Sequence, residues 1–203
     1  IINHIITRTF TPKILPKMNY RDSGIPDSCR TLVVVPMMLT DLHTISDEIE
    51  KLEVRYLANP DSNLLYGLFS DFTDSKTPTA DTDEAFLGAA TGGIENLNRK
   101  YSTDRFFLFH RDRKWCECEQ AFIGWERKRG KLEELSAFID GSTDSDKEIN
   151  SILRFGNANL LRNVSFIITL DSDTQLPHET ARRMIETISH PLNRPQIGKD
   201  NIV

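Results

Sequence analysis

Residues 164–177 read Val-Ser-Phe-Ile-Ile-Thr-Leu-Asp-Ser-Asp-Thr-Gln-Leu-Pro and indicate both a fold class and a place for chemistry. The apolar, β-branched run 164–170 is typical of a strand buried on both faces of a parallel sheet. Asp171 and Asp173 follow this run, and Pro177 keeps the strand from continuing. Ligands of open α/β sheets bind just outside the carboxyl ends of the strands. The two acids therefore lie where a binding site is expected.

The acid pair predicts a metal site. Two carboxylates one residue apart repel each other unless a cation lies between them. Oxygen ligands suit a hard divalent ion, Mg²⁺ or Mn²⁺, and Mg²⁺ is usually held by one or two carboxylates together with substrate phosphates. We therefore expect Asp171 and Asp173 to bind a metal ion and the diphosphate of a nucleotide. The alternative is a strand end with two solvated acids, because Asp-x-Asp triplets are common.

The rest of the chain alternates between strand and helix patterns. Besides 164–170, apolar runs predict strands at 31–35, closed by Pro36, at 64–69 and at 105–109, and periodic stripes predict helices at 41–57, 83–101, 131–139 and 178–189. This alternation predicts an α/β fold, a mainly parallel sheet flanked by helices. Residues 1–30, rich in Pro, Asn, Asp and Ser, are expected to form an extended lead-in to a domain over 31–203.

Composition excludes several classes of protein. The 203 residues are 38% hydrophobic and 27% charged, which is typical of a globular domain. The net charge of −5 argues against a general nucleic-acid binder, which usually has a basic surface. No apolar run approaches the roughly 18 residues of a membrane helix. Three cysteines do not make a disulfide framework, so a reducing compartment is expected.

Charged side chains also follow the other predicted strands. Asp71 follows the second strand, where it can accept a hydrogen bond from the N–H of a uracil ring or cap a loop turn. Further along is a basic cluster between two glycines, Gly124 and Gly130: Arg127, Lys128, Arg129 and Lys131. Glycine lets a backbone approach a phosphate closely, and lysine offers it a point charge. The alternative is a solvated helix start.

Three motifs carry a resemblance to a known family. Residues 124–132 (Gly-Trp-Glu-Arg-Lys-Arg-Gly-Lys-Leu), 169–177 and 190–195 (His-Pro-Leu-Asn-Arg-Pro) resemble the glucosyltransferase domain of cyclic β-1,2-glucan synthases. Residues 30–36, 52–59 and 68–74 match as well, so the similarity covers roughly residues 15–195. That family is related to inverting, processive transferases of the cellulose-synthase type, which have the GT-A fold.

The resemblance implies an activity and assigns roles. Its members are large bacterial inner-membrane proteins that transfer glucose from UDP-glucose to build β-1,2-linked glucan. Residues 31–203 would then form part of a GT-A domain at the cytoplasmic face of that membrane, anchored only by segments outside this chain. Asp171 and Asp173 would hold Mg²⁺ or Mn²⁺ and the UDP diphosphate, Asp71 would read uracil, and Lys128 would lie beside the phosphates. The metal would act as a Lewis acid on the leaving UDP.

The chain also departs from the family pattern. Related enzymes carry a catalytic base, usually an Asp, and a Gln-x-x-Arg-Trp-like acceptor motif after the metal site. Neither occurs before Val203, so we expect the base and the glucan acceptor site beyond this chain. The resemblance then implies a donor-binding half with no catalytic residue of its own, which binds UDP-glucose and has little or no transferase activity alone.

Two alternative functions remain at this stage. A phosphatase of the haloacid-dehalogenase type also has Asp-x-Asp after an apolar strand, with the first Asp as nucleophile. That pattern requires Thr or Val two residues past the second Asp, where this chain has Gln175. The other alternative is a non-catalytic interaction module whose charged residues form only solvated faces.

Overall fold

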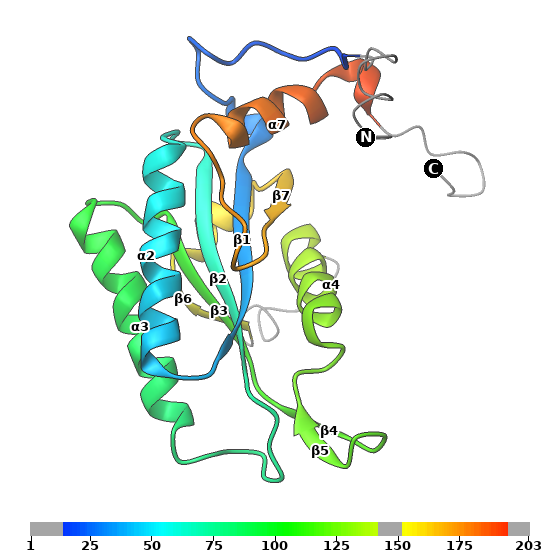
Figure 1. The fold of residues 1–203 in the computed structure, drawn as a ribbon. Helices are drawn as coiled ribbons and strands as arrows, with labels where there is room; N and C mark the ends of the chain where they lie inside the picture. Colours follow the sequence, from blue (N-terminus) through cyan, green and yellow to red (C-terminus); the bar gives the residue numbers. More distant parts are fainter. Residues whose placement is uncertain (1–13, 142–151, 195–203) are drawn as a thin grey trace, which may run out of the picture.

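The computed structural model describes residues 14–141 and 152–194, and its centre is a five-stranded sheet between helices (Figure 1). The strands are β1 (Thr31–Leu39), β2 (Leu64–Phe72), β3 (Phe106–Arg111), β6 (Leu153–Phe155) and β7 (Phe166–Thr169). They lie in the order β6-β3-β2-β1-β7, and only β6 is antiparallel to its neighbour. The prediction of an α/β fold with a mainly parallel sheet is therefore confirmed.

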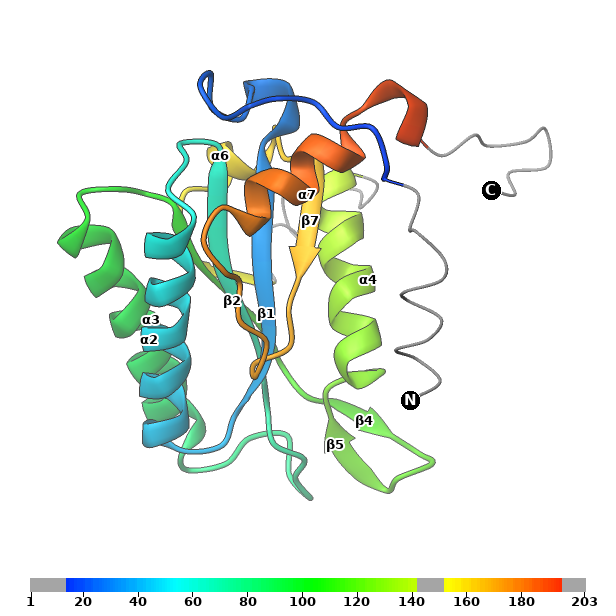
Figure 2. The same ribbon diagram turned by 45° about the horizontal axis from the view of Figure 1, so that its top comes forward.

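Helices cover both faces of this sheet, as Figure 2 shows. On one face lie α2 (Leu42–Ala58) and α3 (Asp83–Lys100), with α7 (Thr180–Ile188) near the amino ends of β1 and β7. On the other lie α4 (Arg127–Asp140) and the short α6 (Ala158–Leu161). A small hairpin, β4 (Lys114–Cys116) and β5 (Ala121–Ile123), precedes α4. None of the helices in 14–141 and 152–194 is long and apolar enough to span a bilayer.

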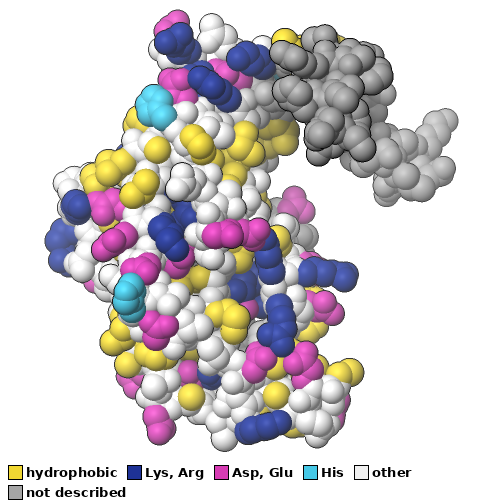
Figure 3. All heavy atoms as spheres, in the orientation of Figure 1, with side chains coloured by type: hydrophobic (Ala, Val, Ile, Leu, Met, Phe, Trp, Pro, Cys, Tyr) yellow, Lys and Arg dark blue, Asp and Glu magenta, His cyan; other side chains and the backbone are white. Residues whose placement is uncertain are grey.

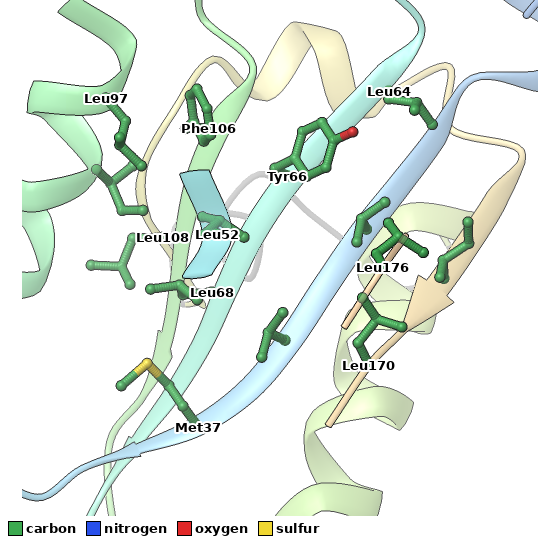
Figure 4. Packing of buried hydrophobic residues seen from close by; sticks show 14 of the residues in the cluster. Met37, Leu52, Leu64, Tyr66, Leu68, Leu97, Phe106, Leu108, Leu170 and Leu176 are labelled. Atoms are coloured by element: carbon green, nitrogen blue, oxygen red, sulfur yellow. The ribbon is translucent and has the colours of Figure 1, made fainter. Parts of the chain in front are cut away.

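The sheet separates two hydrophobic clusters. Because successive side chains of a strand point to opposite faces, Val33 and Val35 of β1 pack toward α2 and α3, whereas Leu32 and Val34 pack toward α4. Figure 4 shows part of the first cluster, in which Leu52 of α2 lies over the sheet. The continuous apolar run of β1 is thus explained by burial on both faces, as predicted.

Strand β1 does not end at Pro36, contrary to our prediction, and continues to Leu39. Leu170 N–H donates to Val34 C=O, so the even-numbered residues of β1 direct their backbone groups toward β7. Pro36 has the same direction, but the register of β7 along β1 ends at Val34. The missing N–H of Pro36 therefore costs no ladder hydrogen bond, and the proline is tolerated.

Strand β7 is an edge strand among the described residues and is not buried on both faces, which corrects our interpretation of 164–170. It pairs only with β1, and of its four residues only Ile168 is buried. An apolar run shows that its side chains can be buried. It does not show whether a strand or helix packs on each side, and β7 lacks a neighbouring strand on one side among the described residues.

The helix predictions are confirmed, with shifted ends. Asp41 caps α2, because its carboxylate accepts from Thr44 N–H at 2.8 Å. Helix α4 begins at Arg127, four residues earlier than predicted. The hairpin, β6, α6 and two 3-10 turns, η1 (Asp27–Cys29) and η2 (Pro191–Asn193), were not predicted. Of the expected lead-in, residues 1–13 lie outside the described residues, and η1 is the only helix or strand in 14–30.

Candidate binding site at the carboxyl edge of the sheet

The predicted acids lie at one edge of the sheet, on either side of β1. Asp71 belongs to the end of β2, where it pairs in register with Met38. Asp171 directly follows Leu170, whose N–H is bonded to Val34 of β1. Helix α4 contacts both acids, so it closes this edge of the sheet from one side.

Asp71 lies in a buried ion-pair network. Its side chain is only 6% exposed, and Arg111 donates from Nε and Nη2 to the two carboxylate oxygens at 2.9 and 3.0 Å. Lys131 Nζ lies 3.0 Å from Oδ2 of the same carboxylate. Asp71 is thus a strand residue held by two cations, and not an acid that caps a loop turn.

Lys131 ties α4 to the sheet. Burial lowers the pKa of Lys131, and the negative charge of Asp71 opposes that shift. Its ammonium group also donates to the carbonyl oxygen of Met37 in β1. Because two of the three N–H groups of the Lys131 ammonium have partners inside the protein, a carboxylate and a backbone carbonyl, this lysine has a structural role and is not a free surface cation.

The two glycines of the 124–130 stretch are required by packing. A Cβ on Gly124 would lie 2.6 Å from Oδ2 of Asp71, and a Cβ on Gly130 would lie 2.2 Å from the carbonyl oxygen of Trp125. We expected these glycines to admit a phosphate, but protein atoms already fill the space beside both. Arg111 donates to the carbonyl oxygens of Trp125 and Arg127, which fixes the tight entry into α4.

Lys128 and Asp171 are the two predicted site residues that the structure brings into direct contact. Lys128 Nζ forms an ion pair with Asp171 Oδ1, and the two side chains are 49% and 64% exposed. Figure 3 shows basic and acidic side chains next to each other on this face of the molecule. Such an exposed pair contributes at most about 1 kcal/mol, so a phosphate or a metal can take over either partner at little cost.

Two other residues of the basic cluster, Arg127 and Lys131, do not join this pair. Arg127 reaches in another direction, where its Nη2 lies 3.0 Å from Asp74 and 3.2 Å from Glu119, and these acids raise its pKa. Lys131 is buried against Asp71, as described above. Of these three residues, Lys128 alone is exposed beside Asp171.

Asp173 lies on the other side of the same turn. The turn is closed by a 2.9 Å hydrogen bond from Thr174 N–H to Asp171 C=O. Asp173 lines a cavity of about 500 Å³ between this turn and α2, together with Lys51 and Arg55. Asp171 therefore contacts α4, whereas Asp173 faces the cavity beside α2.

The carboxylates at this edge of the sheet supply only some of the oxygen ligands that a divalent ion needs. Within 14–141 and 152–194 no three His, Cys, Asp or Glu side chains gather in a way that could hold a metal ion. The protein would supply Asp171 and Asp173, both exposed, and the phosphates of a ligand would have to complete the coordination. Because Asp171 and Asp173 face opposite sides of the turn, they do not form a site for the metal alone, and a metal held by either acid would need the phosphates of a ligand.

Sequence reasoning missed Arg55, and it placed Arg111 at this edge of the sheet without the role that the structure gives it. Arg55 donates to two carbonyl oxygens of the turn that carries Asp171 and Asp173, and Arg111 holds Asp71. A signal for Arg55 exists, since the buried residues of α2 are Ile45, Glu48, Leu52 and Arg55, at helical spacing. A charge on the core-facing stripe of a helix indicates a buried polar contact.

The fold and the edge together define an α/β domain of the class that binds ligands at the carboxyl ends of its strands. No protein-family model matches the chain. Among curated proteins it is 38% identical, over 201 residues and 98% of its own length, to cyclic β-(1,2)-glucan synthase NdvB of Rhizobium meliloti (strain 1021). The chain spans only 7% of the length of that protein. The comparison therefore relates the chain to one region of a glucan synthase, in agreement with the motifs.

Proposed function

We propose that this chain is the donor-binding half of a glucosyltransferase domain of GT-A type, which uses UDP-glucose to build β-1,2-linked glucan. The observation that carries the proposal is the 38% identity to a cyclic β-(1,2)-glucan synthase across 98% of the chain. The exposed Lys128–Asp171 pair at the carboxyl edge of a mainly parallel sheet supports the placement of the donor there.

In this proposal Asp171 and Asp173 hold Mg²⁺ or Mn²⁺ at the donor diphosphate. When bound, the metal neutralises charge on the leaving UDP. Lys128 leaves Asp171 and donates to a phosphate oxygen, so each member of the exposed pair exchanges a protein partner for a ligand partner. The exchange conserves charge pairing, because a cation replaces the ammonium at Asp171 and an anion replaces the carboxylate at Lys128.

The proposed role of Asp71 is to accept a hydrogen bond from the N–H of uracil. An ionised carboxylate has about four acceptor positions, and Arg111 and Lys131 use three of those on Asp71. A base can therefore use the remaining position without breaking the network.

We assign no catalytic base within residues 14–141 and 152–194. In the proposed reaction a base elsewhere in a longer protein takes the proton of the glucan acceptor hydroxyl. That oxygen forms the new bond to the glucose carbon as the bond to UDP breaks, with inversion. The proposal places the longer protein at the cytoplasmic face of the bacterial inner membrane.

Calorimetric titration with UDP-glucose, with and without Mn²⁺, tests the proposal. We expect Mn²⁺-dependent binding that Asp173→Asn weakens at least about tenfold, because a metal ligand is lost. Lys128→Met is expected to weaken binding of UDP both with and without the metal. The matched control is Asp27→Asn, an exposed acid before β1 at the opposite edge of the sheet.

Absence of heat at millimolar ligand, or equal binding by the wild type and Asp173→Asn, would refute the donor site. Rapid hydrolysis of a phosphomonoester would instead support the phosphatase alternative. A melting temperature that neither nucleotide nor metal changes would support a non-catalytic module.

A further inference from the structure

A buried arginine of α2 clamps the turn that carries the acid pair. Arg55 is 4% exposed, and its Nη2 donates to the carbonyl oxygens of Ser172 and Thr174 at 3.1 and 2.9 Å. Its Nε lies 3.3 Å from the Thr174 oxygen as well. One guanidinium thus binds the backbone carbonyls immediately before and after Asp173. Arg55 and this turn are more than one hundred residues apart in the sequence.

The end of α2 holds the following segment too. Asn59 is buried, donates to the carbonyl oxygen of Leu176 at 3.1 Å, and accepts from Ala181 N–H at 3.0 Å. The Ala58 carbonyl accepts from Glu179 N–H at 3.2 Å. Hydrogen bonds from the carboxyl end of α2 therefore hold the whole segment between the acid pair and α7 in place.

The cost of this arrangement indicates that the turn geometry matters. Among the described residues Arg55 forms no ion pair within 4 Å, and its buried Nη1 has no hydrogen-bond partner there. Burial lowers the pKa of Arg55, and the charge of the buried Glu48 opposes that shift without a direct ion pair. Two backbone carbonyls then offset only part of the cost of burying the guanidinium.

We propose that Arg55 is a positioning residue of the donor site. By fixing the turn over residues 171–174, it sets the positions of Asp171, beside Lys128, and of Asp173, beside α2, relative to the diphosphate–metal complex of the proposed function. The inference rests on the proposed function, because it assigns Arg55 a role through the two acids and not through contact with the ligand.

Arg55→Met is the test variant and Arg105→Met is the matched control. Arg105 is a half-buried arginine that donates to the Asp61 carbonyl at 2.6 Å and to the Tyr56 hydroxyl at 2.8 Å, before β3 at the opposite edge. Both substitutions remove an arginine that holds a backbone carbonyl, so both are expected to lower the melting temperature. Only the first touches the turn.

Two readouts are compared at a temperature where both variants are folded. Hydrogen exchange of a peptide over residues 171–177 is expected to speed up at least about tenfold in Arg55→Met, and the Kd for UDP with Mn²⁺ to rise at least about tenfold. Arg105→Met should change neither. Arg55→Lys keeps a cation but loses the fork that reaches two carbonyls, so an intermediate Kd is expected.

The outcomes separate the inference from the proposed function. If the wild type binds and Arg55→Met binds equally well, the positioning role is wrong and the donor site stands. If Arg105→Met weakens binding as much as Arg55→Met, the effect is general destabilisation and the positioning role is again wrong. If the wild type does not bind, the proposed function fails and the role of Arg55 in it fails too. If Arg55→Met does not fold, Arg55→Lys supplies the comparison, and unchanged binding in it overturns the inference.

Discussion

Lowering the pH is predicted to destabilise this protein through one buried histidine. His110 in β3 is fully buried, with Nδ1 2.9 Å from Ser70 Oγ and Nε2 without a hydrogen-bond partner among the described residues. The nearest carboxylate oxygen, on Asp112, is 4.0 Å from Nε2. Burial above all, and then the charge of Arg154, lower the pKa of His110 from 6.5 to about 4, against the opposing charges of Asp112 and Asp71. The imidazole is therefore neutral in the folded protein.

The sign and size of the effect follow from that pKa. Below pH 6.5 the unfolded chain binds a proton at this histidine, whereas the folded protein does not until about pH 4. Stability is thus complete above pH 6.5 and is lost as the pH falls toward 4, since the unfolded state binds more protons. Each pKa unit is worth about 1.4 kcal/mol, so at pH 5 the loss is about 2 kcal/mol. That is a large part of a typical stability of about 5–15 kcal/mol.

Urea unfolding at pH 7.5 and pH 5 measures this loss. His110→Gln keeps a hydrogen-bonding group for Ser70 but does not titrate, so its stability should fall by about 2 kcal/mol less than that of the wild type over this range. His43 is an exposed histidine on α2 whose pKa is raised by a hydrogen bond at its own backbone and by the charge of Asp47, so the stability of His43→Gln should fall at least as much as that of the wild type. Equal losses in the wild type and His110→Gln would refute the reasoning. So would an NMR titration of the His110 ring near pH 6.5 in the folded protein.

Other substitutions test the packing around the site and in α3. Asp71→Asn removes the buried carboxylate that Arg111 and Lys131 share and should cost about 3–5 kcal/mol in urea unfolding, whereas Asp171→Asn should cost less than about 1 kcal/mol. Similar losses would contradict the assignment of one buried and one exposed pair. Gly92→Ala should raise stability by about 1 kcal/mol, because no atom lies within 4 Å of the new Cβ. Gly93→Ala should lose that gain, since its Cβ would lie 2.1 Å from Ile49 Cδ1, and a more stable Gly93→Ala would show that this contact is wrong.

The fold was largely predictable because its main elements are long and periodic. The stripe of α2 and the apolar run of β1 each follow from local sequence, and the parallel arrangement follows from their alternation. The extension of β1 through Pro36 was not predictable, because it depends on where β7 ends beside it. The strands β4, β5 and β6 have only three residues each, which is too few to establish a period.

The candidate site was predictable in residue type but not in geometry. The motifs indicated that Lys128 and Asp171 belong together, and the structure places them in contact across 43 residues. The direction of Asp173 depends on Arg55, which precedes it by more than one hundred residues and contacts the turn only through backbone carbonyls. Such contacts leave no local pattern near the acid pair, so only the three-dimensional arrangement reveals them.

The two lysines on the inner side of α4 show why similar residues have different roles. Lys128 and Lys131 are three residues apart, and each pairs with an acid at the carboxyl edge of the sheet. The pair of Lys131 and Asp71 is buried, so its disruption costs about 3–5 kcal/mol. The pair of Lys128 and Asp171 is exposed and contributes at most about 1 kcal/mol. An anionic ligand can therefore recruit Lys128 without loss of the fold, but it cannot recruit Lys131. The buried network around Asp71 fixes α4 against the sheet, and this fixed helix in turn holds Lys128 at the edge where we place the diphosphate.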